Sequence, residues 1–246
     1  MSTKTTPLKR SIVTAASFVI LIWWLKVAES LLGLSLYPLG VLPRNSDGLV
    51  GILTGPLVHG SWQHLMGNTL PLLMLGSILI YGYPRSRWLA LALIWLLSGT
   101  GVWLFGRDSY HLGASGLSHG MFFYLLVGGL LRRDRRSIAL LMVAFFMYSS
   151  MLMTIFPSEP DVSFEYHLFG AMAGSWSAYI FRKWEPMPPP SLYPWQRRLK
   201  EEQAWEEDDP IIGDQWKSES QRANEQAQTR RVRAADQPVN PLQDAD

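Results

Sequence analysis

The chain has 246 residues, 48% of them hydrophobic, with 11 Trp and no Cys, and its 22 Lys and Arg nearly balance 20 Asp and Glu. The lack of Cys excludes disulfides, thiol nucleophiles and zinc-thiolate sites. The apolar residues stand in long runs rather than at the spacing of a surface helix, which is typical of helices that lie in lipid.

Six of these runs are long enough to cross a bilayer, because a hydrocarbon core about 30 Å thick needs roughly 20 mostly apolar helical residues. They are 11–32, 57–80, 87–105, 115–131, 137–156 and 163–181. The first follows Lys4, Lys9 and Arg10 like a signal peptide, but no small-residue cleavage site comes after it, so we expect a retained span. The sequence therefore predicts an all-α integral membrane protein, with a six-transmembrane-helix bundle over residues 11–183.

The cations predict how this bundle is oriented, because Lys and Arg near the ends of spans stay on the cytoplasmic side. With residues 1–10 in the cytoplasm, eleven cations fall inside and three outside. The run Arg132–Arg136 is interpreted as part of this orientation signal, and no nucleic-acid partner is expected. We expect a multi-pass protein of a bacterial inner membrane with both termini in the cytoplasm.

The composition changes abruptly after Lys183. Residues 184–246 hold eight Lys and Arg against thirteen Asp and Glu, with few aliphatic side chains. So little apolar area cannot offset the entropy lost on ordering. We therefore expect a charged, disordered cytoplasmic tail, and a partner-binding segment around Trp195 to Trp205 is the alternative.

Four polar side chains fall within the predicted spans, where polar groups are costly and each one is a candidate for function. His64 and Asn68 lie in the second span, Ser115 opens the fourth, and His167 lies near the start of the sixth. In the predicted topology all four lie in the outer half of the membrane. His64 and Asn68 are four residues apart on one helix face, where they serve either as paired hydrogen-bond donors or as an interhelical clasp.

Ser115 lies between Gly113 and Gly116 at the start of a predicted helix. Unpaired backbone N–H groups and the positive end of the helix dipole there suit an oxyanion, although a plain Ser N-cap is the alternative. A neutral imidazole at His167 can take the serine proton and return it to a leaving amine. Because no intramembrane Asp is placed to orient that imidazole, the pattern predicts a dyad.

Two pairs of glycines with a spacing of four lie on the fourth and sixth predicted spans. They are Gly116 with Gly120, and Gly170 with Gly174. Small residues at this spacing let helix backbones approach closely in a membrane, either for packing alone or to carry His167 to Ser115.

Three motifs occur together in this chain: HGSWQHLMGN at 59–68, GASG at 113–116 and HLFGAMAG at 167–174. Jointly they resemble the rhomboid family of intramembrane serine proteases, over roughly residues 10–182. The resemblance implies that Ser115 is the nucleophile and His167 the general base. It also implies an oxyanion hole of His64, Asn68 and the Ser115 backbone N–H.

The same resemblance implies a protease that cuts other membrane proteins in or next to their transmembrane segments, without metal or cofactor. The expected partners are such substrates and the lipid bilayer, while self-association stays open. The chain departs from the family pattern in two places. Tyr166 stands where the family often has a small residue, and a Trp-Arg element is not evident in the first outer loop, where Arg44 is the candidate remnant.

Two other functions are considered. One is a catalytically inactive rhomboid-like protein that binds membrane proteins, although such relatives typically lack the serine or the histidine. The other is a metal or proton-coupled transporter that uses the five histidines, which are His59, His64, His111, His119 and His167. No H-E-x-x-H motif supports that second alternative.

Overall fold

The structure is a computed structural model that describes residues 7–157, 163–185, 195, 198–199 and 217–235. The chain divides into two compact units, Met1–Met187 and Pro188–Asp246, and each is considered by itself. The described part of the first unit is helical. Its β pairing there is confined to one isolated antiparallel bridge between Val41 and His111.

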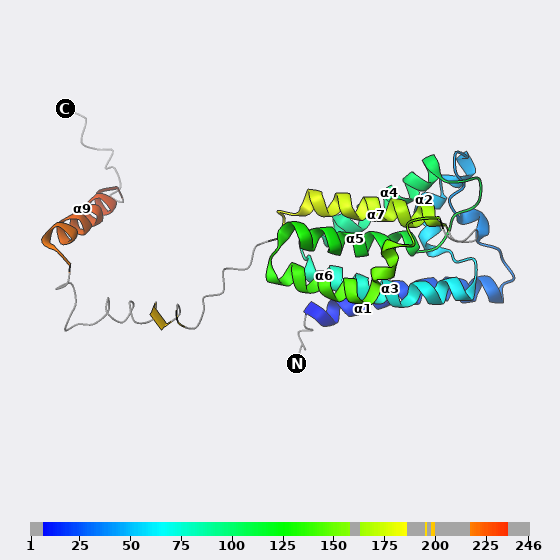
Figure 1. Cartoon of the computed structure of the whole chain (residues 1–246), viewed down its shortest axis with the longest axis horizontal. Coiled ribbons are helices and arrows are strands. Elements are labelled where there is room, and N and C mark those ends of the chain that lie inside the picture. The colour runs from blue at the N-terminus through cyan, green and yellow to red at the C-terminus, as the bar shows by residue number, and fades with distance from the viewer. Residues whose placement is uncertain (1–6, 158–162, 186–194, 196–197, 200–216, 236–246) are drawn as a thin grey trace, which may run out of the picture. The chain divides into compact units, whose positions relative to one another are not determined.

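Six long helices form the described part of the first unit (Figure 1). They are α1 (Pro7–Leu31), α3 (Trp62–Gly82), α4 (Arg87–Phe105), α5 (Ser115–Arg132), α6 (Arg135–Tyr148) and α7 (Phe164–Phe181). The connection between α1 and α3 holds short turns, which are η1 (Tyr37–Leu39), η2 (Ser46–Gly48), α2 (Gly51–Thr54) and η3 (Gly55–Leu57), and η4 (Ser149–Leu152) continues α6. All six lie within or close to the predicted runs.

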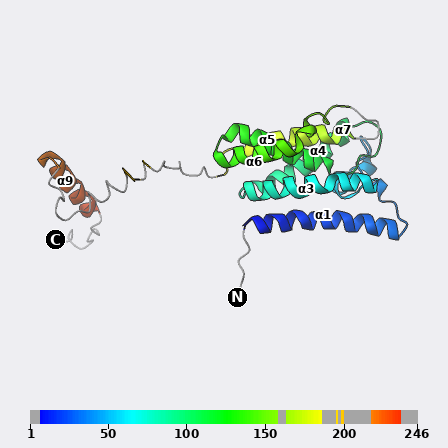
Figure 2. The ribbon, with the colours of Figure 1, turned by 60° about the horizontal axis from the view of Figure 1, so that its bottom comes forward.

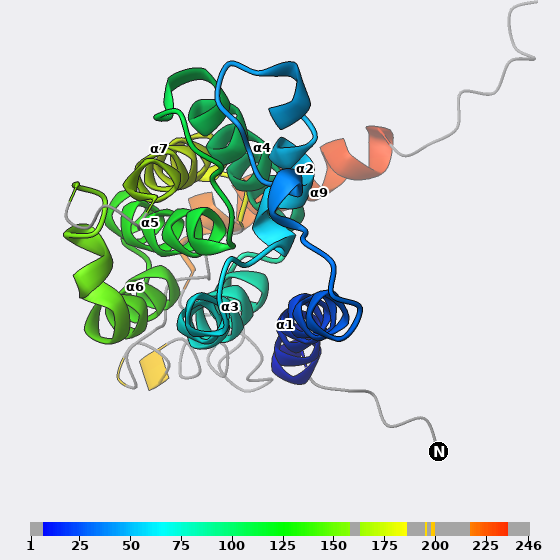
Figure 3. The same cartoon turned by 90° about the vertical axis from the view of Figure 1, so that its right-hand side faces the viewer.

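Helices α1, α3, α4 and the segment Arg135–Leu152 are long and apolar enough to cross a membrane. Helices α5 and α7 do not reach the same apolarity, because polar residues interrupt their apolar runs. The packing explains why they can be polar. Helix α5 lies inside the unit, in contact with α3, α4, α6 and α7, so little of its surface needs to suit lipid (Figure 3).

The outer helices, in contrast, have apolar surfaces that are exposed. Large apolar side chains are exposed on them, for example Ile20 and Trp24 on α1, Phe146 on α6 and Trp176 on α7. Exposed apolar surface on this scale is typical of a membrane or partner interface rather than of a soluble protein. Helix α1 lies at the edge of the unit, where it packs against α3 (Figure 2).

The second predicted span begins later than expected. Residues 57–61 are not α-helical, and α3 starts at Trp62, after Ser61 accepts a hydrogen bond from the His64 backbone N–H at 3.1 Å. A serine side chain that satisfies a free N–H in this way marks a helix start.

The chain stays packed on the first unit beyond α7. The Glu185 carboxylate accepts hydrogen bonds of 2.9 Å from the backbone N–H groups of Arg85 and Ser86 and from the Ser86 hydroxyl. Arg132 donates to the carbonyls of Arg182 and Glu185. The first residues after Lys183 therefore cover the end of the unit at which α4 begins.

The predicted disordered tail contains a helix, α9 (Glu219–Ala235). Its sequence is rich in Ala, Gln, Glu and Arg, which have high intrinsic helix propensity, and Lys217 pairs with Glu225 at 2.9 Å. The expectation of a disordered tail relied on the lack of apolar surface, and it stays a prediction for the tail outside this helix. The alternative partner-binding segment, Trp195 to Trp205, lies largely outside the described residues.

Candidate active site

Ser115 is the first residue of α5, and the residue in the N-cap position is Ala114. The Ser115 side chain therefore does not cap the helix, which removes the plain N-cap alternative. Two bonds hold the preceding backbone. The Gly113 N–H donates to the Gly55 carbonyl at 2.9 Å, and the Ala114 N–H donates to His59 Nε2 at 3.4 Å.

Gly113 is required at this position for two reasons. Its φ is +104°, a backbone conformation that residues with a side chain rarely adopt, and a Cβ there would overlap the His64 ring. The glycine thus lets His64 lie directly against the loop that ends at Ser115.

The four predicted site residues share one cavity of about 640 Å³. His64 and Asn68 come from α3, Ser115 from α5 and His167 from α7. These helices begin at the same end of the unit (Figure 1). The cavity lies at that end, because residues near the start of each helix line it. The three sequence motifs, at 59–68, 113–116 and 167–174 in the chain, therefore meet in space.

The hydrogen bonding of His167 sets its tautomer. Its Nδ1 lies 2.9 Å from the Thr154 carbonyl oxygen, which can only accept, so Nδ1 carries the hydrogen. Nε2 is then left with a lone pair and can act as a base. Among the described residues no hydrogen bond joins this nitrogen to the Ser115 hydroxyl. Such catalytic bonds are often long without substrate and shorten when it binds.

His64 and Asn68 lie one turn apart on the face of α3 that lines the cavity. The Asn68 amide donates one hydrogen bond to the His64 carbonyl at 3.1 Å, and its second N–H is available, because a side-chain amide has two donors. The His64 ring packs edge to face against His59, with ring centroids 5.2 Å apart. His59 does not itself line the cavity, so this packing orients His64 from outside the cavity lining.

The glycine pairs bring α5 and α7 into direct contact. A Cβ added at Gly170 would overlap the Gly116 carbonyl, and one added at Gly174 would overlap the Gly120 carbonyl. The predicted close approach of these two helices is therefore confirmed. His167 lies one turn before Gly170, so this contact fixes its helix beside Ser115.

The departure at Tyr166 is accommodated by glycines. Its ring is fully buried and packs with Val41 and Val102, while Gly116 and Gly55 leave the space that the ring and hydroxyl fill. A large residue before the histidine is thus compatible with the contact between α5 and α7.

Arg44 ties the first connection to the loop that leads to Ser115. Its guanidinium donates to the Gly106 carbonyl at 2.8 Å and pairs with Asp108, and its backbone N–H donates to the Trp103 carbonyl at 2.8 Å. Trp103 in turn donates from Nε1 to the Asn45 carbonyl at 2.9 Å. Arg44 therefore has a structural position away from the cavity.

Two loop histidines support the site from outside the long helices. Burial, together with the neighbouring His64, lowers the pKa of His59 to about 3, which keeps it neutral and able to accept from Ala114. Burial also lowers the pKa of His111, against the opposing effects of the Arg107 carbonyl and the Glu165 charge. His111 binds Ser163 Oγ at 2.6 Å, which joins the 106–114 loop to the start of α7.

Two further residues at the cavity were missed by the sequence analysis. The His119 ring stacks on the His167 ring, with centroids 3.9 Å apart and planes 9° from parallel, and Thr154 bonds both rings. The spacing of four between Ser115 and His119 could have placed both on one helix face. Thr154 acts on His167 through a backbone carbonyl, which every residue carries, so no sequence pattern could have revealed it.

The arrangement of these histidines does not suit a metal. Within the described residues no three His, Asp or Glu side chains converge as a ligand set. Both ring nitrogens of His119 and one of His167 already bind protein groups. The transporter alternative gains no support from this geometry.

Comparison with known proteins covers the same region. A family model described as Rhomboid domain matches residues 46–184, which include every residue of the cavity from Gly60 to His167. The uncharacterized protein Rv1337 of Mycobacterium tuberculosis is 38% identical over 192 residues, which are 73% of this chain and 80% of that protein. The uncharacterized protein ML1171 of Mycobacterium leprae is 35% identical over 178 residues, covering 68% and 70%.

No solved structure matches the chain. The family match nevertheless spans more than half of the sequence, and the apolar helices within it have the length and composition of membrane spans. The protein is an integral membrane protein, and the chain belongs to the rhomboid family.

Proposed function

We propose that this protein is an intramembrane serine endopeptidase that hydrolyses peptide bonds in or next to transmembrane segments of other membrane proteins. One observation carries the proposal: in a rhomboid-family protein, a serine, a histidine with a bare Nε2 and two hydrogen-bond donors line one cavity. They are Ser115, His167, His64 and Asn68.

The first half of the reaction forms an acyl-enzyme. His167 Nε2 takes the proton from Ser115 Oγ as this oxygen attacks the carbonyl carbon of the scissile bond. The negative oxygen of the tetrahedral intermediate accepts hydrogen bonds from the His64 ring, the Asn68 amide and the Ser115 backbone N–H. His167 then gives its proton to the leaving amine, and the C–N bond breaks.

Water completes the cycle. His167 Nε2 takes a proton from a water molecule, whose oxygen attacks the acyl carbon, and the proton returns to Ser115 as the ester bond breaks. Protein groups supply each of these proton transfers, so the proposed mechanism calls for no metal or cofactor.

The position of the site determines which bonds can be cut. All six long helices are proposed to span a bacterial inner membrane with both termini in the cytoplasm, which puts the cavity in the outer half. A helical substrate segment has its carbonyls hydrogen-bonded internally and must unwind before Ser115 can reach one. Bonds at or near the outer end of a substrate helix are therefore the expected targets.

The test compares the membrane proteomes of cells that express the wild type or Ser115→Ala. A membrane protein with one span that is shortened only with the wild type supports the proposal. Ser175→Ala is the matched control, because the Ser175 hydroxyl on α7 donates to its own helix at Ala171, 2.8 Å away, and does not line the cavity. Identical proteomes for the wild type and Ser115→Ala would contradict the proposal.

A further inference from the structure

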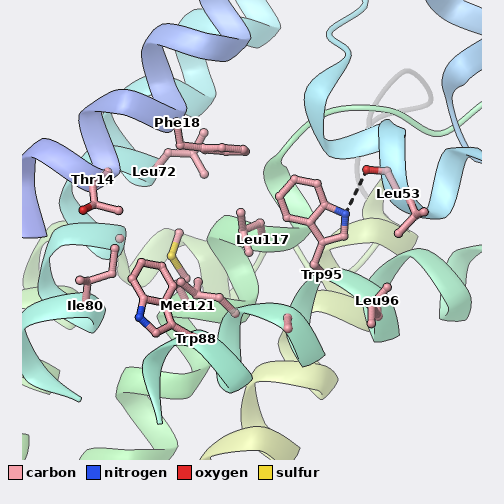
Figure 4. A pocket seen from close by; sticks show the side chains of 14 residues that line it. Thr14, Phe18, Leu53, Leu72, Ile80, Trp88, Trp95, Leu96, Leu117 and Met121 are labelled. Carbon is pink, nitrogen blue, oxygen red and sulfur yellow. Dashed lines mark hydrogen bonds between the residues drawn. The ribbon is translucent and has the colours of Figure 1, made fainter. Parts of the chain in front are cut away.

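An apolar cleft of about 580 Å³ lies between α1 and α4, and it shares no lining residue with the cavity at Ser115 (Figure 4). Small residues leave this space, because Ala15 of α1, Gly76 of α3 and Ala92 of α4 line it. Large apolar side chains form its walls, and they include Phe18, Leu72, Trp88, Trp95, Leu117 and Met121. Helix α1 packs on α3, and α4 packs on α5 and α7, so the cleft is a gap between two neighbouring parts of the unit.

Two lining side chains that carry a hydrogen-bond donor already have partners in the protein. Thr14 donates its hydroxyl to the Arg10 carbonyl at 2.9 Å, and Trp95 donates its N–H to the Leu53 carbonyl at 3.2 Å (Figure 4). An apolar space stays free of water, and an empty one loses dispersion contacts along its whole lining. The occupant expected in a membrane is therefore hydrocarbon.

The dimensions of the cleft fit a chain better than a helix. Its lining runs from Leu72 to Ile80 on α3 and from Trp88 to Leu96 on α4. At 1.5 Å per residue this is a length of about 12 Å, so the volume of about 580 Å³ gives a mean cross-section of about 50 Å². An α-helix about 10 Å across needs roughly 80 Å². A membrane helix of another protein or of a second copy is thus too wide, whereas an extended acyl chain is thinner.

The two ends of the cleft differ in what surrounds them. Phe18 and Trp95 meet across it edge to face, with ring centroids 5.7 Å apart. Thr14, Ile80 and Trp88 lie closer to the end of the unit at which α1 and α4 begin and α3 ends (Figure 4). A chain that enters from the membrane surface at this end passes these three residues first and then reaches the aromatic pair.

Arg87 places a positive charge at this entrance. Its Nη1–H donates to the Ile80 carbonyl at 3.0 Å, and its guanidinium lies 5.4 Å from the Trp88 ring centroid. Both Ile80 and Trp88 line the cleft, so these contacts hold the guanidinium beside it. The bond to Ile80 uses one of five N–H groups and leaves the charge in place, because a carbonyl is uncharged. Among the described residues no carboxylate pairs with Arg87.

The helices around the cleft add positive charge at the same end and little negative charge. Lys9 and Arg10 lie in the first turn of α1, and Arg10 is one turn before Thr14. The sequences of α1, α3 and α4 hold a single acidic residue, Glu29, which is near the opposite end of α1. The Glu185 carboxylate beside the start of α4 is buried and accepts three hydrogen bonds. Basic groups between membrane helices at such a surface attract anionic headgroups.

We propose that the cleft binds one acyl chain of an anionic phospholipid from the leaflet at the end of the unit where α1 and α4 begin. The chain fills the apolar space between Trp88 and Trp95. The phosphate accepts hydrogen bonds from N–H groups of Arg87 that the Ile80 carbonyl does not use, and such charged pairs are strong. A zwitterionic lipid has the same chain but carries its own cation, so it binds more weakly. This site does not depend on the proposed protease activity.

The test is native mass spectrometry of the full-length protein from vesicles of equal phosphatidylglycerol and phosphatidylcholine with matched acyl chains. One retained phosphatidylglycerol per wild-type chain is expected, with phosphatidylcholine about fivefold less frequent, which is the effect of about one cation near an anionic surface. Equal retention of the two lipids would overturn the proposal. So would a mass of two protein chains without lipid, which would assign the cleft to a second copy.

Two variants fill the cleft. A Cβ at Gly76 would meet Ala15 and Met121 at ordinary contact distances of 3.4 and 3.8 Å, so the Gly76→Leu side chain can occupy the space of the acyl chain. This variant and Ala92→Phe should each retain at least about tenfold less lipid, because the occupied space excludes the ligand. Ile20→Phe is the matched control, since Ile20 is exposed on α1 and does not line the cleft. Unchanged retention in both filling variants, with melting temperatures like the wild type, would overturn the proposal.

Two variants separate the charge of Arg87 from its hydrogen bond to Ile80. Arg87→Gln keeps an amide N–H that can donate to this carbonyl but removes the charge, whereas Arg87→Lys keeps both a donor and the charge. We expect Arg87→Gln to retain the two lipids about equally and Arg87→Lys to keep most of the preference for phosphatidylglycerol. A preference unchanged in Arg87→Gln, or lost in both variants alike, would overturn the assignment of the headgroup to this charge.

Discussion

Two of the cavities among the described residues have nearly the same volume, about 640 and 580 Å³, and both are bordered by α5, yet their linings differ in polarity. The cavity at Ser115 is lined by polar side chains that form hydrogen bonds to specific protein atoms, as His167 and His119 do. The cleft between α1 and α4 is lined by apolar side chains. The volume of a cavity therefore does not indicate its function here, whereas the polar groups in its lining do.

The packing around the two cavities differs for a physical reason. Reacting groups must be held to within about an ångström, so the helices that bear Ser115 and His167 touch through glycines without intervening side chains. A site for a flexible chain needs no such precision. The looser contact between α1 and α4, bridged by Phe18 and Trp95, is sufficient there.

The largest difference between the cavities should appear on removal of the reacting groups. Ser115→Ala and His167→Ala should each lower cleavage on the order of 10⁴-fold or more, and the double variant should be no worse, because nucleophile and base act as a unit. Gly76→Leu, in the apolar cleft, should stay within about tenfold of the wild type. Turnover of the substrate found by the proteome comparison measures all four variants. Near-normal turnover in either single variant would rule out the dyad.

The next largest effect is expected at the glycine contact between α5 and α7. Gly170→Leu places a side chain into the Gly116 carbonyl, so we expect α7 to move and cleavage to fall at least about 10²-fold without change to a reacting residue. Met172→Leu, at an exposed position of α7, is the control and should be neutral. Turnover and thermal unfolding are measured for both variants, so that a loss of activity can be told from a loss of folding. A fully active Gly170→Leu would mean that this contact does not set the site geometry.

Asn68→Ala tests whether the donors on α3 stabilise charge or only hold helices together. If they bind the oxyanion, kcat should fall by about 10²-fold with little change in KM. The effect on stability should be about 1 kcal/mol or less, since the amide bonds its own helix at the His64 carbonyl. Steady-state kinetics with a thermal melt separates the two roles. Lower stability with intact specific activity would restore the interhelical clasp.

Acid should weaken the polar site through His59. Its pKa in the folded protein is about 3, below the unfolded value of about 6.5, so stability is fully present above pH 6.5 and declines as pH falls. Between pH 6.5 and 5 the loss is about 2 kcal/mol, or about 4 to 8 °C in melting temperature. His59→Gln should reduce this dependence, and His111, whose pKa is also lowered by burial, should account for part of what is left. A wild-type melting temperature equal at both pH values would show that His59 is not held neutral.

The smallest effect concerns the segment after α7. Truncation after Met187 should leave cleavage within about twofold of the wild type, because it keeps the Glu185 carboxylate that binds Arg85 and Ser86. Truncation after Lys183 removes that carboxylate and should cost about 1–3 kcal/mol through the unpaired groups. Melting temperatures of the two truncated proteins check this. Equal stability would assign Glu185 no role at this end.

Much of the fold was predictable because long apolar runs and Lys and Arg at their ends are strong patterns. The run 87–105 has the bounds of α4, and the glycine spacing predicted the contact between α5 and α7. The meeting of Ser115 with His167 and the α3 pair also followed from motifs. Their catalytic roles stay predictions.

The remainder depends on groups that no residue pattern marks. Thr154 orients His167 through a carbonyl, and Glu185 covers the end of α4 from beyond the last predicted span. The stacking of His119 on His167 depends on ring rotamers that spacing alone does not specify. Helix α9 forms from residues with high helix propensity and no apolar face, so a reading based on hydrophobicity did not predict it.

The most direct measurement of the central claim is the intact mass of the protein after treatment with a fluorophosphonate. The account predicts one adduct on the wild type, assigned by peptide sequencing to Ser115, and also on Ser175→Ala. Ser115→Ala should carry no adduct, and His167→Ala should react far more slowly. An unmodified wild type, or an adduct on any other residue, would contradict the assignment of Ser115 as an activated nucleophile.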